Sequence, residues 1–420
     1  MDPHTEHLRI SPARFQANFD ALSKIGATDD GGVHRPALSE THLAARAWFR
    51  ERIREIGIEP RVDGAGNHSA YLPCGPEDGP TLLIGSHLDS VPHGGRFDGA
   101  LGVLAALEVL IVVKETGISL PINLEAIDFT DEEGTHFGLM GSSALAGNLS
   151  RSDLEHPRGG KAAFVEDLNR AGLTEDGLLN AARHKGSLAG FIEVHIEQGT
   201  RLIDANAEIG VVTSIIGIGS SILTFIGRSD HAGTTSMEDR LDASQGASAF
   251  ILATRDILLE DFPQCVANVG QINLKPGVFN IVPAEAILGL EYRAPEAHTL
   301  HRLGQALIER ARSEANRFGL RLEVEELGEY PPSPMNDAVR SAIADAADSL
   351  GLNHIPLASM AGHDAQSLAG LCPVGMIFVP SVDGASHSPR EFTTWENCIH
   401  GANALLQTAL RLALNNDQAG

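Results

Sequence analysis

Two side chains that can bind a metal lie on either side of one predicted strand-to-helix turn. Residues 82–84 form an apolar run that predicts a buried strand, and His87 follows it closely. A glycine-rich loop then leads to Asp98, and an apolar helix is expected to begin near Gly99. Side chains fixed at a strand end and a helix start keep their geometry, as a metal site requires. This spacing indicates a metal site if the rest of the chain supplies more ligands.

Three consecutive acids follow the next predicted strand, at the end of the segment PINLEAIDFTDEEG. They are Asp131, Glu132 and Glu133. A solvated acidic turn is one interpretation of such a run. However, neighbouring strands of a parallel sheet end side by side, where the sites of α/β proteins lie. We therefore expect the acids to lie near His87 and Asp98, where cations would relieve their mutual repulsion.

Two more histidines follow apolar, strand-like segments. His195 lies in FIEVHIEQG, where it shares one face of a strand with two glutamates, and His387 lies in GASHSPREF after the apolar segment 373–381. For His195 alone, a buried structural histidine is an equally good interpretation.

The candidate ligands contain imidazole and carboxylate groups but no thiolate. They are His87, Asp98, Glu133, His195 and His387. This set suits Zn²⁺, with Mn²⁺, Co²⁺ or Ni²⁺ as substitutes. Five ligands exceed the three of a mononuclear catalytic zinc site and match two ions that share a carboxylate, for which Asp98 is the natural bridge. Asp89 is expected to accept the other ring N–H of His87.

Three polar side chains occur in turns and at a strand end between residues 211 and 328. His231 lies in RSDHAGTTSM, Asn280 in GVFNIVP and Arg293 in LEYRAPE. Each alone is more typical of a structural role. Together they suit an anionic, amide-like ligand, because arginine binds a carboxylate through two parallel hydrogen bonds.

The order of predicted elements indicates two domains within 420 residues. Strands alternate with helices in residues 1–210 and again in 329–420, which predicts an α/β catalytic domain with a mixed, mostly parallel sheet. Residues 211–328 predict an inserted α+β domain of βαββαβ order, in which 211–228 reads as one long strand. Its β-branched, glycine-containing strands are suited to pairing across a dimer edge.

Composition excludes several classes of protein. The chain has 31 basic and 55 acidic residues and a net charge of -24, which argues against nucleic acid as a partner. Its four cysteines are far apart, so neither a disulfide framework nor a thiolate zinc site is expected. We find neither a secretory signal nor an apolar run long enough for a membrane span, so we expect a cytoplasmic protein with no membrane partner.

Several motifs occur together in a characteristic order over nearly the whole chain. They are GSHLDSVPHGGRFDGALGV, FTDEEG, HIEQG, DHAGTT, FNIVP with Arg293 after it, AGHDA, and FVPS followed by SHSP. With them the chain resembles the amidase, hydantoinase/carbamoylase family of binuclear zinc hydrolases, which has an M20 metallopeptidase-like fold. One departure is Ser236, where that family commonly has proline.

The resemblance implies a role for each candidate residue. His87, Asp98 and His195 would bind one metal ion, and Asp98, Glu133 and His387 the other. Glu132 would be the general base, and His231 would stabilise the tetrahedral oxyanion. The substrate would be held by a set of polar side chains: Gln198, His231, Asn280 and Arg293.

The resemblance also implies an activity and an assembly. We expect hydrolysis of N-carbamoyl-L-amino acids, with allantoate amidohydrolase and β-ureidopropionase as close alternatives and an M20 aminoacylase or dipeptidase as a distant one. His195 favours the carbamoylase branch, since typical M20 peptidases have Asp or Glu there. A non-catalytic binding protein is disfavoured because neither a ligand nor the base is missing. The family dimerises through the inserted lid domain, which leaves open whether His231 acts within its own chain or across the dimer.

Overall fold

A computed structural model describes residues 5–415, which form two compact units. Unit 1 contains the chain up to Thr213, then Pro334–Leu357, and the chain from Gly362 onward. Unit 2 contains Ser214–Ser333 and Ala358–Ala361. Within residues 5–415, every helix is too short or too polar to cross a membrane.

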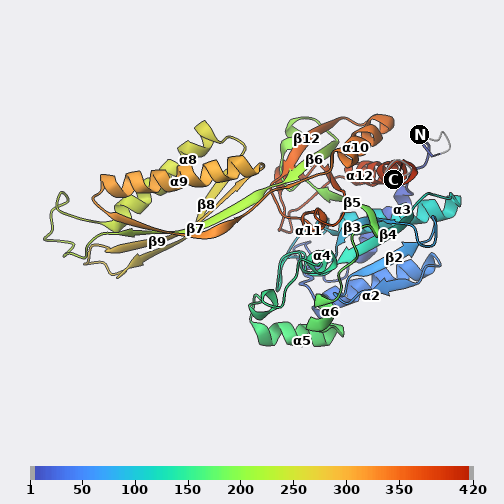
Figure 1. The fold of residues 1–420 in the computed structure, drawn as a ribbon, viewed down its shortest axis with the longest axis horizontal. Coiled ribbons are helices and arrows are strands. Elements are labelled where there is room, and N and C mark those ends of the chain that lie inside the picture. The colour runs from blue at the N-terminus through green and yellow to red at the C-terminus, as the bar shows by residue number, and fades with distance from the viewer. Residues whose placement is uncertain (1–4, 416–420) are drawn as a thin grey trace. The chain divides into compact units, whose positions relative to one another are not determined.

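The helices and strands follow the order drawn in Figure 1. The helices are α1 (Pro12–Leu22), α2 (Glu40–Glu55), α3 (Ala100–Thr116), α4 (Met140–Ala146), α5 (Lys161–Ala171), α6 (Glu175–Leu179), α7 (Arg201–Asp204), α8 (Ala243–Asp261), α9 (Ala297–Arg317), α10 (Asp337–Leu350), α11 (Asp364–Leu368) and α12 (Trp395–Leu414), with 3₁₀ turns at Asp153–Glu155 and Val382–Gly384. The strands are β1 (Pro60–Val62), β2 (His68–Leu72), β3 (Thr81–His87), β4 (Asn123–Phe129), β5 (Leu188–Ile196), β6 (Ile209–Ile215), β7 (Gly217–Ile226), β8 (Val266–Lys275), β9 (Glu285–Ala294), β10 (Arg321–Tyr330), β11 (Ser333–Pro334), β12 (His354–Ser359) and β13 (Val374–Val379).

Unit 1 is built on one mixed sheet in the order β1-β2-β4-β3-β5-β13-β6-β11, with β12 paired to β6. The central strands β4, β3, β5 and β13 run parallel, whereas β2 and β6 flank them antiparallel. Strands β3, β4 and β13 are buried along their whole length, but only β13 is apolar throughout, because β4 buries three polar side chains and β3 ends in Ser86 and His87. The expected mixed, mostly parallel sheet is confirmed.

The pairing register brings the carboxyl ends of the central strands to one edge. His87 lies opposite Phe129 on β4, and His195 lies opposite Phe378 on β13. Helix α3 is apolar around its whole circumference and buried from Ala100 to Val113, because it packs on β3 and also against α1 and α12. The start of α3 is therefore fixed beside that edge.

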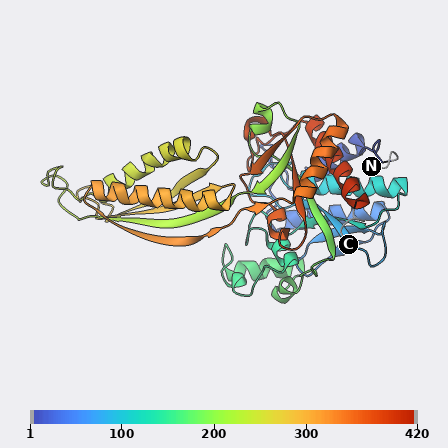
Figure 2. The same ribbon diagram turned by 45° about the horizontal axis from the view of Figure 1, so that its top comes forward.

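Unit 2 is a four-stranded antiparallel sheet in the order β10-β7-β9-β8, with helices α8 and α9 side by side on one face (Figures 1 and 2). Buried and half-buried residues alternate along β7 and β9, as expected for strands with one covered face. The element order β7-α8-β8-β9-α9-β10 is the expected βαββαβ pattern.

The prediction of one long strand over residues 211–228 is wrong. It is two strands, because β6 pairs with β13 in the sheet of unit 1 and β7 belongs to unit 2. Between them the Ile216 N–H donates to Ser359 O at 3.0 Å, outside either strand. Both halves favour β structure equally, so composition gives no sign of the break.

One buried arginine ties together the strand ends of unit 1. The Arg46 guanidinium contacts Asp128 at 2.8 Å and donates to the Gly66 and Phe129 carbonyls, each at 2.9 Å. The other carboxylate oxygen of Asp128 accepts from Leu88 N at 2.8 Å. The ends of β3 and β4 are thus held in register from beneath.

Replacement of Arg46 tests this role. We expect Arg46→Ala to lower the free energy of unfolding by about 3–5 kcal/mol, because it leaves the Asp128 carboxylate buried without its partner. Urea denaturation measures the change. The exposed Arg54→Ala serves as the control and should change stability by less than about 0.5 kcal/mol. An Arg46→Ala protein as stable as the unaltered chain would contradict the argument.

Candidate metal centre

The five expected metal ligands all lie in unit 1, at the carboxyl edge of its sheet. His87 ends β3 and His195 lies near the end of β5. Asp98 precedes α3, Glu133 follows β4 and His387 follows β13. The sheet therefore brings together residues separated by up to 300 positions in the chain.

The first group of ligands surrounds one oxygen of Asp98. His195 Nε2 lies 3.0 Å and His87 Nε2 lies 3.4 Å from Asp98 Oδ1. Ligand atoms around a tetrahedral ion with bonds of about 2.0–2.1 Å are about 3.3 Å apart, so the group has the dimensions of a zinc site. All three side chains are buried.

The second group uses the other oxygen of the same carboxylate. His387 Nε2 lies 3.2 Å from Glu133 Oε2 and 3.7 Å from Asp98 Oδ2. The two oxygens of Asp98 thus face different groups of ligands, as a carboxylate between two ions must. The His387 backbone has φ 51°, a left-handed conformation that costs energy outside glycine and is common at functional sites.

The ring orientations leave the correct nitrogens available. His87 Nδ1 lies 3.1 Å from the Asp89 carbonyl, and His195 Nδ1 lies 2.9 Å from the Ile196 carbonyl. A proton on each Nδ1 leaves the lone pair on Nε2, which is the atom beside Asp98. In this structure Nε2 of His195 also accepts from Gly99 N at 3.2 Å. The tautomer of both histidines is therefore set by main-chain acceptors.

Charge in the site favours bound cations. Glu132 Oε2 lies 3.6 Å from His87 Nε2, and burial, with Glu133 and Asp364 nearby, raises the pKa of Glu132 well above its usual value. Burial and the neighbouring Asp98 also raise the pKa of Glu133. Glu133 Oε1 is buried without a hydrogen-bond partner among residues 5–415. Such an excess of buried carboxylate is what divalent ions neutralise, so the donor set fits them.

Two glycines make room for the ligands. A Cβ on Gly99 would lie 2.5 Å from the His87 ring, and Gly99 itself has φ 62°. A Cβ on Gly95 would lie 2.0 Å from the carboxyl carbon of Glu391. Any other residue at either position would displace a side chain that contacts or positions Asp98.

Glu391 and Ser386 are site residues that sequence reasoning missed. Glu391 Oε1 accepts from the main-chain N–H groups of Phe97 and Asp98 at 2.9 and 3.0 Å. The Ser386 hydroxyl donates to Asp98 Oδ2 at 3.0 Å. Both residues lie in GASHSPREF, the segment that contains His387, and this position is the sequence signal that could have identified them.

His363 was also missed, although it lies in the quoted motif AGHDA. Its ring centroid is 4.6 Å from that of His195, and Glu193, His195 and His363 form a further group able to hold a metal. That group shares His195 with the first, so the two compete for one ligand. Burial lowers the pKa of His363 well below its usual value, so it is neutral at neutral pH.

Two expected site residues, Asp89 and Gln198, make contacts other than those expected of them. The Asp89 carboxylate is 3.8 Å from His87 Nδ1, and it accepts instead from the main-chain N–H groups of Glu132 and Glu133 at 3.3 and 3.2 Å. It therefore positions the acidic turn, and its carbonyl orients His87. Gln198, expected to contact the substrate, donates to Asp98 Oδ2 at 2.8 Å.

The other three expected residues lie in unit 2, where two of them are neighbours. His231 pairs with Ile281 in an isolated bridge, and Ala232 N donates to Asn280 O at 3.1 Å. Arg293 lies near the end of β9, where it contacts Glu291 at 2.8 Å and the Met360 carbonyl at 3.1 Å.

Comparison with known proteins identifies the family to which this chain belongs. The sequence pattern of peptidase family M20/M25/M40 matches residues 83–411. An N-carbamoyl-L-amino acid amidohydrolase from Geobacillus stearothermophilus is 37% identical over 96% of this chain and 99% of that protein. An allantoate amidohydrolase from Bacillus subtilis (strain 168) is 32% identical over 93% of this chain and 95% of that protein.

Solved structures give the same result. The crystal structure of an amidase of the hydantoinase/carbamoylase family from Burkholderia multivorans has a TM-score of 0.87 and 34% sequence identity to this chain. The match covers 97% of this chain and 99% of that one.

Metal content tests the two groups of ligands. We expect two divalent ions per chain, about one in His195→Ala and one in His387→Ala, and fewer in Asp98→Ala, because only Asp98 contributes to both groups. Inductively coupled plasma mass spectrometry after dialysis measures the ratio. His301→Ala, on an exposed part of unit 2, is the control and should keep both ions. Two ions retained by Asp98→Ala would exclude the shared carboxylate.

Proposed function

Because this chain belongs to peptidase family M20/M25/M40, we propose that it is a metal-dependent amidohydrolase that cleaves the carbamoyl group from N-carbamoyl-L-amino acids. The products are the amino acid and carbamate, which decomposes to CO₂ and ammonia. Unit 1 is the catalytic domain in this proposal, assigned to residues 1–210 and 329–420, and residues 211–328 are the lid and dimerisation domain.

The observation that carries the proposal is the position of Glu132 beside two ligand groups that share Asp98. Divalent ions, Zn²⁺ in our proposal and Mn²⁺, Co²⁺ or Ni²⁺ as substitutes, would be held by these groups, where they supply Lewis acidity to a carbonyl and lower the pKa of water. Glu132 accepts the proton of the attacking water and returns it to the leaving nitrogen as the C–N bond breaks. The net change is the addition of one water to the ureido group.

The remaining polar residues suit the other parts of the substrate. Arg293 pairs with the carboxylate, and Asn280 donates a hydrogen bond to it. The side-chain nitrogen of Gln198 already donates twice within the protein, so its buried Oε1, which has no partner among residues 5–415, accepts from the ureido N–H groups. His231 donates to the oxygen that becomes negative during attack, a contribution typically worth about 3–4 kcal/mol. Closure of the lid excludes water and completes this set.

The geometry of unit 2 supports a role for His231 across a dimer. His231 and Asn280 lie at the end of the sheet where β9 begins, whereas Arg293 is eight residues further along that strand. At about 3.4 Å per residue, this separates them by about 27 Å, far more than the length of a small ureido acid. One lid therefore supplies either the His231–Asn280 end or Arg293 to a given site, and a second chain supplies the other.

The two edges of the unit 2 sheet favour pairing through β8. Strand β8 has one charged residue, Lys275, and exposes Val266 and Ile272, with Leu252 exposed on the neighbouring α8. Strand β10 at the opposite edge has four glutamates, which repel a second copy. Charged edge strands resist self-pairing and apolar ones promote it, so β8 is the proposed dimer edge.

The alternative activities of the family differ in the size and shape of the substrate that they cleave. Allantoate amidohydrolase and β-ureidopropionase activities use the same chemistry on ureido acids of other shapes. An M20 aminoacylase or dipeptidase activity would cleave an amide without release of ammonia from a carbamoyl group. Ammonia release therefore separates the ureido acids from the peptides.

An ammonia-release screen tests the activity. We expect turnover of N-carbamoyl-L-amino acids above that of N-carbamoyl-β-alanine, allantoate and dipeptides. Glu132→Gln should lose about 10²–10⁴-fold in kcat while retaining both ions, because it removes the proton acceptor. Glu51→Gln, on the exposed face of α2, is the control and should be fully active. Because dipeptides release no ammonia, their cleavage is followed in parallel as free amino acid. Cleavage of dipeptides alone would refute the carbamoylase assignment, and full activity of Glu132→Gln would refute the base.

The oligomeric state tests the proposed edge. We expect a dimer in light scattering with size-exclusion chromatography, and a monomer when Leu252→Glu on α8 and Ile272→Glu on β8 are combined, because both place a charge on the β8 side of the unit 2 sheet. Leu327→Glu, on exposed β10, should leave the dimer intact. Dissociation by Leu327→Glu but not by the Leu252 and Ile272 double variant would place the interface on the other edge.

A further inference from the structure

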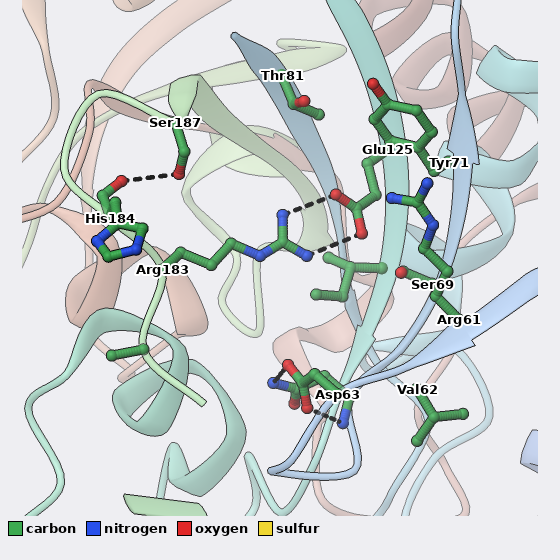
Figure 3. A pocket seen from close by; sticks show the side chains of 13 residues that line it. Arg61, Val62, Asp63, Ser69, Tyr71, Thr81, Glu125, Arg183, His184 and Ser187 are labelled. Atoms are coloured by element: carbon green, nitrogen blue, oxygen red, sulfur yellow. Dashed lines mark hydrogen bonds and ion pairs between the residues drawn. The ribbon is translucent and has the colours of Figure 1, made fainter. Parts of the chain in front are cut away.

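A second cavity opens in unit 1, and none of the candidate metal ligands lines it. It has a volume of about 490 Å³. Strands β1, β2 and β4, the first residue of β3 and the segment 182–187 surround it (Figure 3). Small-molecule sites typically occupy about 300–1,000 Å³, so this cavity has room for a metabolite.

A closed ion pair lies at the base of this cavity. Arg183 Nη1 and Nη2 donate to the two oxygens of Glu125 at 2.7 and 2.8 Å (Figure 3). Burial raises the pKa of Glu125, but the contacts with Arg183 outweigh it and hold the pKa below its usual value. Both groups are therefore charged, and each neutralises the other.

The second carboxylate that lines the cavity, that of Asp63, also has its hydrogen-bond partners within the protein. Asp63 accepts from the main-chain N–H groups of Ala65 and Asn67 and from the Asn67 side chain, each at 2.9 Å. It closes the turn between β1 and β2. Neither lining carboxylate is thus available for a cationic ligand.

Arg61 differs from these groups. It is an exposed residue whose guanidinium lies over the Tyr71 ring at 4.0 Å. Its charge helps to lower the pKa of Glu125, but no carboxylate of residues 5–415 lies within ion-pair distance of it. The ring holds the guanidinium flat without neutralising it. Figure 3 places Arg61 and Tyr71 together beside Glu125 in the wall of the cavity.

We propose that this cavity binds a small organic monocarboxylate. A carboxylate pairs with the Arg61 guanidinium through two parallel hydrogen bonds, and a short carbon chain lies against Val62, Ile127 and Ala182. The Thr81 hydroxyl offers a further polar contact. A dianion such as phosphate fits less well, because Arg183 is already neutralised and Arg61 supplies a single charge.

The cavity is connected to the catalytic turn through Asn67. This lining residue accepts from Thr130 N at 3.0 Å and donates to the Gly141 carbonyl at 3.1 Å. Thr130 stands two residues before Glu132. A ligand in the cavity would lie against Asn67, so we extend the proposal to a regulatory role, in which binding restricts the segment that carries the general base.

Calorimetry with the metal-loaded protein tests the proposal without any need for catalysis. The experiment uses Arg293→Ala as the background, to remove the carboxylate subsite proposed in unit 2, and titrates butyrate, its neutral analogue butyramide and inorganic phosphate. We expect butyrate to bind more tightly than the other two. Adding Arg61→Ala should weaken butyrate at least about tenfold, since charge-assisted hydrogen bonds contribute about 1.5–3 kcal/mol. Adding Arg54→Ala instead should change nothing.

Hydrogen–deuterium exchange of the same proteins tests the connection. Butyrate should slow exchange in residues 63–67 and 130–133 severalfold, and Arg61→Ala should abolish this protection. Equal binding of butyrate and butyramide, or butyrate binding that is indifferent to Arg61→Ala, would overturn the site. Protection limited to residues 63–67 would overturn the regulatory role.

Discussion

The candidate site depends on one carboxylate facing two ways. Asp98 Oδ1 lies against His87 and His195, and Oδ2 lies on the side of Glu133 and His387. A carboxylate can do this only if its backbone is fixed, and here two main-chain N–H groups at the start of α3 are held by Glu391. The buried α3 and the parallel strands beside it supply the rigidity, because neither can shift without exposing apolar surface.

The buried carboxylates beneath the strand ends and those at the strand ends have different partners. Beneath the strand ends, Asp128 has an ion pair with Arg46 and accepts from Leu88 N, although burial still raises its pKa to about 6. At the strand ends, the only cationic neighbours of Glu132 and Glu133 among residues 5–415 are imidazoles, and burial together with nearby carboxylates raises the pKa of both. The unbalanced charge lies where cations are expected and the balanced charge lies where only stability is required. The two groups of acids thus differ in whether an arginine forms an ion pair with them, and not in the direction of their pKa shift.

Local patterns predicted most of the strands of unit 1, and long-range contacts account for what they missed. The ends of β3 and β5 were visible because apolar runs stop at His87 and shortly after His195. Glu391 was not, because its role is to accept from the main chain of residues almost 300 positions away. The break between β6 and β7 at Ile216 was not predicted either. Both halves of the segment 211–228 favour β structure, and they differ only in which sheet they join. The carboxylate of Asp89 was expected to contact an imidazole, but backbone N–H groups from another strand end are nearer.

The contrast between the edges of the unit 2 sheet limits how far assembly can proceed. In the proposed dimer, an antiparallel pairing of two β8 strands is symmetric, so it uses the β8 edge of both chains. Strand β10, with its four glutamates, would then stand at both ends of the joined sheet. Charged edge strands resist further pairing, so such a sheet would double once and stop there.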